Sequence, residues 1–329
     1  MERLPFLEGG NTAGLSVELT SLEITVKQKP GSNFTNCIGP RWNLDKSGFA
    51  PCIHGGLVLR YMGDNLTIFT IPKPFKGKYG LMQENAIRSW QLVFQPKDIF
   101  LFGTEEDIGK DCERLGCARK GIRLNKEFGA PRVDTAFERA QRDATTSLMA
   151  FINTDMIFGP EIRKAIEVVT ERFERFLIIG QKTDVDFIEP IDFSNETWWE
   201  KLRTFALKNG GLHGKCGLDY FIFPRGKVYQ GSTDQPLGLK AADGRIQPYM
   251  IGRKTWDNAL MWIVALQGIP VVDATKAILA FHPHVALMRV KSGPPYDYNR
   301  RIGGKAGRYG RTNLAAWELT EDGELRERK

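Results

Sequence analysis

The strongest constraint on the fold is an alternation between two kinds of segment from residue 66 onward. Short runs rich in β-branched and aromatic residues, typical of buried strands, are separated by longer stretches whose apolar residues recur at helical spacing. Strands that alternate with helices are typical of a mostly parallel sheet flanked by helices, so we predict an α/β fold. The predicted strands are 66–71, 99–102, 148–152, 176–179, 220–223 and 270–272.

The segments between these runs carry the helical pattern. Ile87, Trp90 and Phe94 are spaced three or four residues apart and so share one helix face. A later helix is expected from about Thr255 to Leu266, with Gly268 beyond its end.

The flanking segments have a different composition. Residues 1–64 are rich in Gly, Pro, Asn and Ser and have few periodic apolar positions, which predicts an irregular N-terminal extension. Residues 291–329 are basic and begin rich in glycine, which indicates either a solvated tail or a lid over an anionic ligand. The expected division is therefore 1–64, a main domain at 65–290, and 291–329.

The charge of the chain limits its partners. There are 46 Lys and Arg residues against 39 Asp and Glu, a net charge of +7. This favours an anionic partner such as a phosphate or a nucleotide, although a soluble basic protein without one has the same composition. Aromatic residues are sparse in the basic C-terminal run, so nucleic acid is not expected. No apolar run approaches the roughly 20 residues that span a bilayer, so the compartment stays open: cytoplasm as the chain stands, or Golgi lumen if an N-terminal anchor has been removed.

Polar side chains directly after a central strand are the first candidates for a site, because open α/β sheets bind ligands at the carboxyl ends of their strands. Asn153, Thr154 and Asp155 follow the run 148–152. On an extended backbone Asn153 and Asp155 project to the same side, where oxygen ligands can hold a hard cation beside a diphosphate. A turn that simply ends the strand is the alternative.

The run 128–138 leading into 151–155 resembles the nucleotide-diphospho-sugar transferase superfamily, the GT-A glycosyltransferases, and the similarity extends over about 66–285. It implies a GT-A-like (Rossmann-like) sheet and an acidic motif, usually Asp-x-Asp, that holds Mn²⁺ or Mg²⁺ on the donor diphosphate. Asn153 departs from that motif, which leaves Asp155 as the stronger ligand. The resemblance makes His282 a second ligand, with His284 as the near alternative.

Asp257 lies in the first turn of the predicted helix that follows residues 252–255. In inverting members of the family, an acidic residue at such a helix start takes the proton from the acceptor hydroxyl. Retaining enzymes of this fold also carry acids near this point, and a carboxylate is favoured at any helix N-terminus. The resemblance thus implies that Asp257 is the catalytic base.

The remaining site residues are placed by analogy with the family. The residues expected at the nucleotide are Thr70, Pro72, Lys73, Gly103, Glu106, Asp134, Asn153 and Thr154. An acceptor site is expected at His213, Asp219 and Trp256, since sugars are bound by aromatic faces with polar groups around them.

These observations predict a metal-dependent glycosyltransferase that moves a sugar from a UDP- or GDP-sugar donor to a hydroxyl of a glycan acceptor, with inversion at the anomeric carbon. The alternative is a non-catalytic relative that binds a nucleotide sugar or a glycan, in which Asn153 has replaced a needed carboxylate. A nucleotidyltransferase is disfavoured because residues 71–74 are not the glycine-rich basic loop that opens such enzymes.

Overall fold

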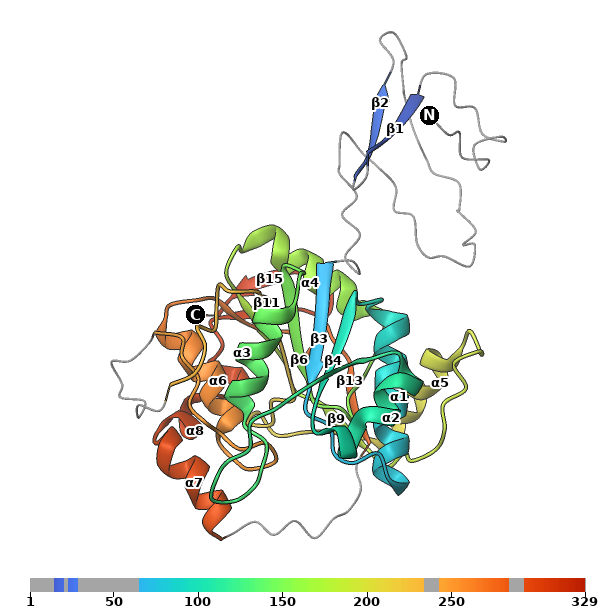
Figure 1. The fold of residues 1–329 in the computed structure, drawn as a ribbon. Coiled ribbons are helices and arrows are strands. Elements are labelled where there is room, and N and C mark those ends of the chain that lie inside the picture. Colours follow the sequence, from blue (N-terminus) through green and yellow to red (C-terminus); the bar gives the residue numbers. More distant parts are fainter. Residues whose placement is uncertain (1–14, 21–22, 29–64, 234–242, 284–292, 329) are drawn as a thin grey trace. The chain divides into compact units, whose positions relative to one another are not determined.

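The computed structural model describes residues 15–20, 23–28, 65–233, 243–283 and 293–328 (Figure 1). The chain forms two compact units, Met1–Tyr61 and Met62–Lys329. In the first unit, β1 (Leu15–Thr20) pairs antiparallel with β2 (Glu23–Gln28). The segment expected to be irregular therefore contains a two-stranded sheet.

The second unit is built on a nine-stranded sheet with the strand order β15-β14-β12-β8-β11-β6-β3-β4-β5. Strand β11 runs antiparallel to β6 and β8, and β15 runs antiparallel to β14, while the other neighbouring strands are parallel. This confirms the predicted mostly parallel sheet. The strands are β3 (Leu66–Thr70), β4 (Asp98–Phe102), β5 (Ala118–Lys120), β6 (Leu148–Ile152), β8 (Leu177–Ile179), β11 (Tyr220–Pro224), β12 (Val271–Asp273), β14 (Trp317–Leu319) and β15 (Leu325–Glu327).

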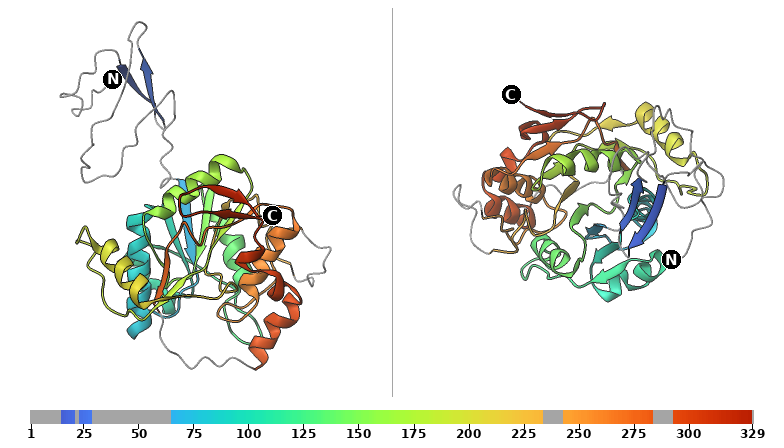
Figure 2. Two further views of the ribbon diagram at one scale, coloured as in Figure 1. Left: turned by 180° about the vertical axis from the view of Figure 1, so that it is seen from behind. Right: turned by 90° about the horizontal axis from the view of Figure 1, so that it is seen from above.

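Helices cover both faces of this sheet, as Figure 2 shows. Alternate residues of β3 enter different apolar cores: Ile68 belongs to the cluster that includes residues of α1, α2 and α4, whereas Phe69 belongs to the cluster that includes residues of α3 and α6. Strands that are buried on both faces have continuous apolar sequences, which explains why the predicted strands are apolar runs without alternation. The helices are α1 (Gly77–Val93), α2 (Glu105–Leu115), α3 (Val133–Asp143), α4 (Glu161–Arg172), α5 (Trp198–Asn209), α6 (Trp256–Leu266), α7 (Pro294–Gly303) and α8 (Ala306–Tyr309), with a 3₁₀ turn, η3 (Thr312–Leu314).

A second, four-stranded sheet lies within the same unit. Its strands, in spatial order, are β10 (Gly211–Leu212), β9 (Thr183–Val185), β13 (Ala280–Pro283) and β7 (Ile157–Phe158). Strands β9 and β13 are parallel, and their register places His282 opposite Asp184. This pairing joins two segments almost a hundred residues apart and positions part of the site described below.

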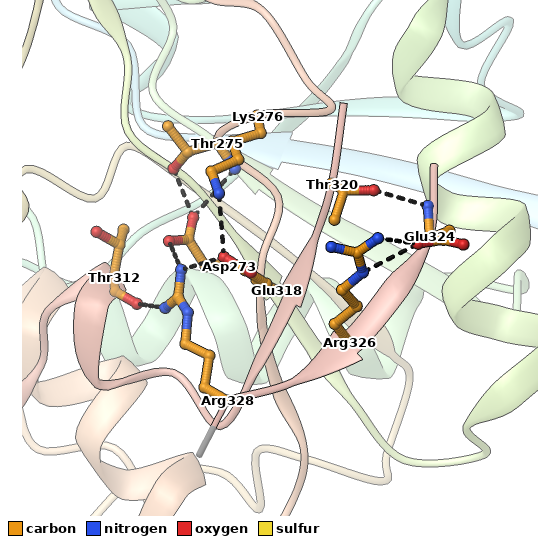
Figure 3. Close-up of polar contacts among 9 residues, drawn as sticks. All are labelled: Asp273, Thr275, Lys276, Thr312, Glu318, Thr320, Glu324, Arg326 and Arg328. Atoms are coloured by element: carbon orange, nitrogen blue, oxygen red, sulfur yellow. Dashed lines mark hydrogen bonds and ion pairs between the residues drawn. The ribbon is translucent and has the colours of Figure 1, made fainter. Parts of the chain in front are cut away.

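Residues 293–328 belong to the same compact unit as the main domain. Strand β14 pairs in parallel with β12 and thereby extends the main sheet. The guanidinium of Arg328 donates to Asp273 Oδ2 at 2.8 Å, to the carbonyl of Thr312 at 2.6 Å and to Glu318 at 3.3 Å (Figure 3). The C-terminal strands thus complete the main sheet.

Among the described helices, none has the length and apolar character needed to cross a membrane.

Candidate active site

A cavity of about 1580 Å³ opens at the carboxyl ends of three parallel strands. Its wall includes the residues that follow β3 (71–74), the end of β4 (102–104) and the residues that follow β6 (153–155). The opposite wall comes from the start of α6 and from α7 and α8. This is the position at which open α/β sheets bind ligands.

Most residues nominated from the sequence lie in this one cavity. Those that line it are Pro72, Lys73, Gly103, Asn153, Thr154, Asp155, His213, Asp219, Trp256, Asp257 and His282. His284 lies outside the described residues.

Three residues expected at the nucleotide do not line the cavity. The Thr70 hydroxyl is buried and shares a 2.8 Å hydrogen bond with the hydroxyl of Thr154. Asp134 is fully buried and forms an ion pair with Arg132 at 2.6 Å. Glu106 is exposed on α2. Thr70 and Asp134 thus hold neighbouring segments in place, and Glu106 faces solvent.

Four side chains form a histidine–carboxylate network, which comprises Asp155, His282, Asp184 and His213. Asp184 accepts hydrogen bonds from two imidazoles, at 2.8 Å from His282 Nδ1 and 2.6 Å from His213 Nδ1. The other nitrogen of His282, Nε2, lies 3.7 Å from Asp155 Oδ2. His282 is therefore held between two carboxylates, with Nε2 directed at Asp155.

The electrostatics of the network keep both carboxylates ionised. Burial opposes the charge of Asp155, but His282, Lys73 and Lys182 outweigh it, so the pKa of Asp155 lies below its usual range. Burial is likewise outweighed at Asp184, whose pKa is lowered by His213, His282 and Lys182. For His282, burial lowers the pKa, but the two carboxylates more than compensate and raise it.

Asp155 and His282 fit a divalent cation on their donor chemistry and orientation. In the neutral imidazole, ionised Asp184, which can only accept, fixes the proton of His282 on Nδ1 and leaves Nε2 as the nitrogen that can bind a metal, the arrangement in which metal-binding histidines are oriented. Cation binding at Nε2 would therefore displace the second proton that the raised pKa favours. Within the described ranges, no group of three His, Cys, Asp or Glu side chains is placed to hold a metal ion. A cation here would have one carboxylate and one imidazole as such protein ligands, and oxygens of substrate phosphates and water would have to complete its coordination.

Asn153 has a different set of partners. Its backbone N–H donates to the Asp219 carbonyl at 2.8 Å, and its side-chain amide donates to the Asp219 carboxylate. That carboxylate also pairs with Lys182 Nζ at 2.7 Å. Because its NH₂ group is used in this way, Asn153 has only its amide oxygen left to face a cation.

Asp257 stands at the start of α6 in a different electrostatic environment. Burial, with a smaller contribution from the charge of Asp219, raises the pKa of Asp257 to about 7. Thr255 occupies the N-cap position two residues earlier, but its side chain makes no capping hydrogen bond and its φ is 88°. A β-branched residue in this left-handed region is strained, by roughly 1–3 kcal/mol.

Lys182 and Asp184 belong to the site but are not among the residues predicted from the sequence. Both follow β8 within a few residues, so the rule that drew attention to Asn153 and Asp155 applies to them equally. Asn258 was also missed, and its contacts with two other segments are described below.

No protein-family model matches this chain, and no curated protein does. Solved structures with similar parts include a protein described as a nucleotide-diphospho-sugar transferase from Desulfovibrio desulfuricans (9% identity, TM-score 0.31, covering 50% of this chain and 65% of that one). Another is S. aureus TarS 1-349 in complex with UDP-GlcNAc (13% identity, TM-score 0.28, covering 40% of this chain and 38% of that one). A third is glucosyl-3-phosphoglycerate synthase from Mycobacterium tuberculosis (11% identity, TM-score 0.28, covering 36% of this chain and 43% of that one). The matched part spans less than two thirds of each of these proteins. At these TM-scores the similarities define no family, and the function has to come from the residues of the site.

Proposed function

We propose that this protein is a glycosyltransferase that uses a nucleotide-sugar donor and a divalent cation. The observation that carries the proposal is the presence of two carboxylates with opposite properties in one cavity. Asp155 is held ionised beside an oriented histidine, whereas Asp257 has a pKa raised to about 7. Carboxylates whose environments separate their pKa values in this way commonly have separate chemical roles.

The donor side of the cavity is formed by residues 71–74, 102–104 and 153–155. The nucleotide would lie along the ends of β3 and β4, with its diphosphate at Asp155 and His282 and with Asn153 in support. Mn²⁺ or Mg²⁺ bound there would neutralise the charge that develops on the departing diphosphate. Asp184 holds His282 in the orientation that this requires.

Asp257 is the proposed general base. With a pKa near 7, it is substantially ionised at neutral pH and still basic enough to accept the proton of an acceptor hydroxyl. Attack by that hydroxyl on the anomeric carbon forms the new glycosidic bond and breaks the bond to the diphosphate. A single displacement of this kind inverts the anomeric centre.

The proposed acceptor residues differ in how accessible they are. His213 is 40% exposed and faces the cavity, so it is free to meet a sugar hydroxyl through Nε2. Trp256 is largely buried and packs against Phe151 and Phe221 at ring-centroid distances of 5.4 and 6.0 Å. Asp219 is engaged by Lys182 and Asn153, and its role is to hold them in place.

Calorimetric titration of UDP and of GDP, with Mn²⁺ and with chelator, tests the proposal. We expect one nucleotide to bind with Mn²⁺, and we expect chelator or Asp155→Ala to abolish binding. Asp297→Ala, which removes an exposed carboxylate on α7 in the same cavity, is the matched control and should bind normally. Absence of nucleotide binding under every metal condition would overturn the proposal. Binding without any sugar release or transfer would instead favour the non-catalytic alternative.

A further inference from the structure

The charges that line the cavity are unequal in number. Eight Lys and Arg side chains line it, against four Asp side chains. Three of the basic residues have carboxylate partners: Lys73 with Asp155 at 3.3 Å, Lys182 with Asp219 at 2.7 Å, and Arg300 with Asp297 at 3.6 Å. The other five form what we call the basic rim: Arg253, Lys254, Arg301, Arg308 and Arg311.

No described residue supplies a carboxylate partner for the basic rim. Arg253 and Arg301 lie over aromatic rings of α7, at 5.5 Å from the centroid of Tyr296 and 5.7 Å from that of Tyr298. Stacking of this kind orients a guanidinium without neutralising it. The Nε atom of Arg253 is buried and makes no hydrogen bond within the described structure. A buried donor without an acceptor in a cavity wall calls for a ligand that supplies one.

The rim is fixed to the helix that carries Asp257. The side-chain amide of Asn258, the next residue in α6, donates to the carbonyls of Cys216 at 2.9 Å and Gly310 at 2.7 Å. Gly310 lies between Arg308 and Arg311, and a Cβ at this position would come within 1.9 Å of the Asn258 carbonyl oxygen. Arg253 and Lys254 lie in the loop that leads into α6. Figure 1 shows α6, α7 and α8 together on one side of the unit.

The donor leaves the charge of the rim unbalanced. A nucleotide-diphosphate sugar carries two negative charges on its diphosphate, and a divalent cation bound with it carries two positive ones, so the pair adds no net charge to the cavity. The excess of basic side chains next to Asp257 therefore remains after donor binding. Since the base has to reach the attacking hydroxyl, groups beside it face the acceptor.

We propose that the acceptor is an anionic carbohydrate, with a phosphate or carboxylate group that the basic rim binds while Asp257 faces the reacting hydroxyl. The inference rests on the proposed function, because it takes the cavity to be a transferase site. Guanidinium groups suit such a ligand, because their planar N–H donors match the oxygens of phosphate and carboxylate in pairs.

The test measures the binding of three simple sugars to protein saturated with Mn²⁺ and the nucleotide that binds it. We expect glucose 6-phosphate or glucuronate to bind at least tenfold more tightly than glucose, and the preference to weaken as KCl is raised. Which of the two anions is preferred distinguishes a phosphorylated acceptor from a uronic acid. Arg308→Ala and Arg311→Ala should each reduce the preference, and the triple variant with Arg253→Ala should abolish it.

Arg326→Ala is the matched control, since it removes an exposed arginine of β15 that does not line the cavity. Equal binding of all three sugars, or a preference that survives the triple variant, would overturn the inference. The inference would also be overturned if the arginine variants lost affinity for the nucleotide but still preferred the anionic sugars over glucose, because the basic rim would then bind the donor. Nucleotide binding without an anion preference contradicts this inference alone, whereas failure to bind any nucleotide overturns the proposed function as well.

Discussion

The two walls of the cavity differ in whether their charged side chains have partners: one carries the histidine–carboxylate network and the other carries the basic rim. In the histidine–carboxylate network, each carboxylate has an imidazole beside it, and Asp184 joins two imidazoles from different segments. In the basic rim, five cationic side chains have aromatic or solvent surroundings and no carboxylate partner among the described residues.

This difference shows which part of the site is organised before a ligand arrives. Hydrogen-bonded groups hold each other in fixed positions, so under the proposed function the network would receive the cation and the diphosphate without rearranging. Unpaired cations repel one another and gain most from a ligand that brings negative charge. Asp257 stands in the second wall, at the start of α6 and beside the basic rim, and burial raises its pKa to about 7.

The largest effect is expected for Asp257→Asn, which removes the proposed proton acceptor from the wall that carries the basic rim. Loss of a general base reduces turnover by about 10²–10⁴-fold. Nucleotide binding should stay unchanged, since the network is untouched. Turnover and calorimetry on the same samples check this, and Asp297→Asn is the control. Full activity in the Asp257→Asn variant would mean that the base lies elsewhere.

The same residue predicts a pH dependence with a defined sign. Below pH 7, kcat/KM should fall about tenfold per pH unit as Asp257 takes up its proton. Its pKa is higher in the folded chain than the ordinary value of about 4, so the folded state binds the proton more tightly. This contribution to stability is present below about pH 4 and is lost as the pH rises toward 7. The stability difference between wild type and Asp257→Asn should therefore change over that window in thermal unfolding, and a constant difference would contradict the raised pKa.

Asp184→Asn tests whether the network depends on its central carboxylate. Without that charge, His282 loses the partner that fixes its Nδ1 proton. Replacing such a partner usually lowers metal affinity by about 10–100-fold. We expect this loss in Mn²⁺-dependent nucleotide binding, measured by calorimetry over a range of Mn²⁺ concentrations. Asp186→Asn, an exposed acid two residues along the chain, should behave as wild type.

Asn258→Ala should weaken the attachment of the rim. The buried carbonyl of Gly310 would lose its donor, at a cost of about 1–3 kcal/mol, and the partly buried carbonyl of Cys216 would lose its donor at a smaller cost. Chemical denaturation measures this loss, and Asn313→Ala on the exposed side of η3 is the comparison. A variant as stable as wild type would show that α8 is held by other contacts.

The smallest effect is expected at Thr255. Thr255→Gly removes the strain of a β-branched residue at φ 88°, whereas Thr255→Ala removes the same hydroxyl and methyl but retains a Cβ. The glycine variant should therefore be more stable than the alanine variant by roughly 1 kcal/mol. The reverse order in thermal unfolding would show that the backbone relaxes once the side chain is shortened.

The fold could be predicted from the sequence because most strands of the main sheet are local apolar runs between turn residues. Strand β14 was missed since Trp317–Leu319 is short and only partly buried, and its place in the sheet depends on pairing with β12. Asp155 could be nominated from its position after an apolar run, and His282 from the family resemblance. Asp184 could not be connected to His282 in the same way, because the parallel pairing of β9 with β13 is a long-range register that no local pattern encodes.

Glu106 shows a further limit of reasoning from strand ends. It follows β4, yet it projects from α2 into solvent, while Gly103 and Thr104 form the cavity wall. The order of elements along the chain fixes which edge of the sheet holds a site. It does not fix which side chains of each following segment turn inward.

The amide of Asn258 joins segments that leave the ribosome at different times. Residue 216 is made before the helix that carries Asp257, and residue 310 is made about fifty residues after it. During synthesis, the strands that carry Asp155 are complete long before α8 exists. Since chains begin to fold from the N-terminus as they are made, a nascent chain acquires the wall at the ends of β3, β4 and β6 first, and the wall beside Asp257 closes only when the last segment has emerged.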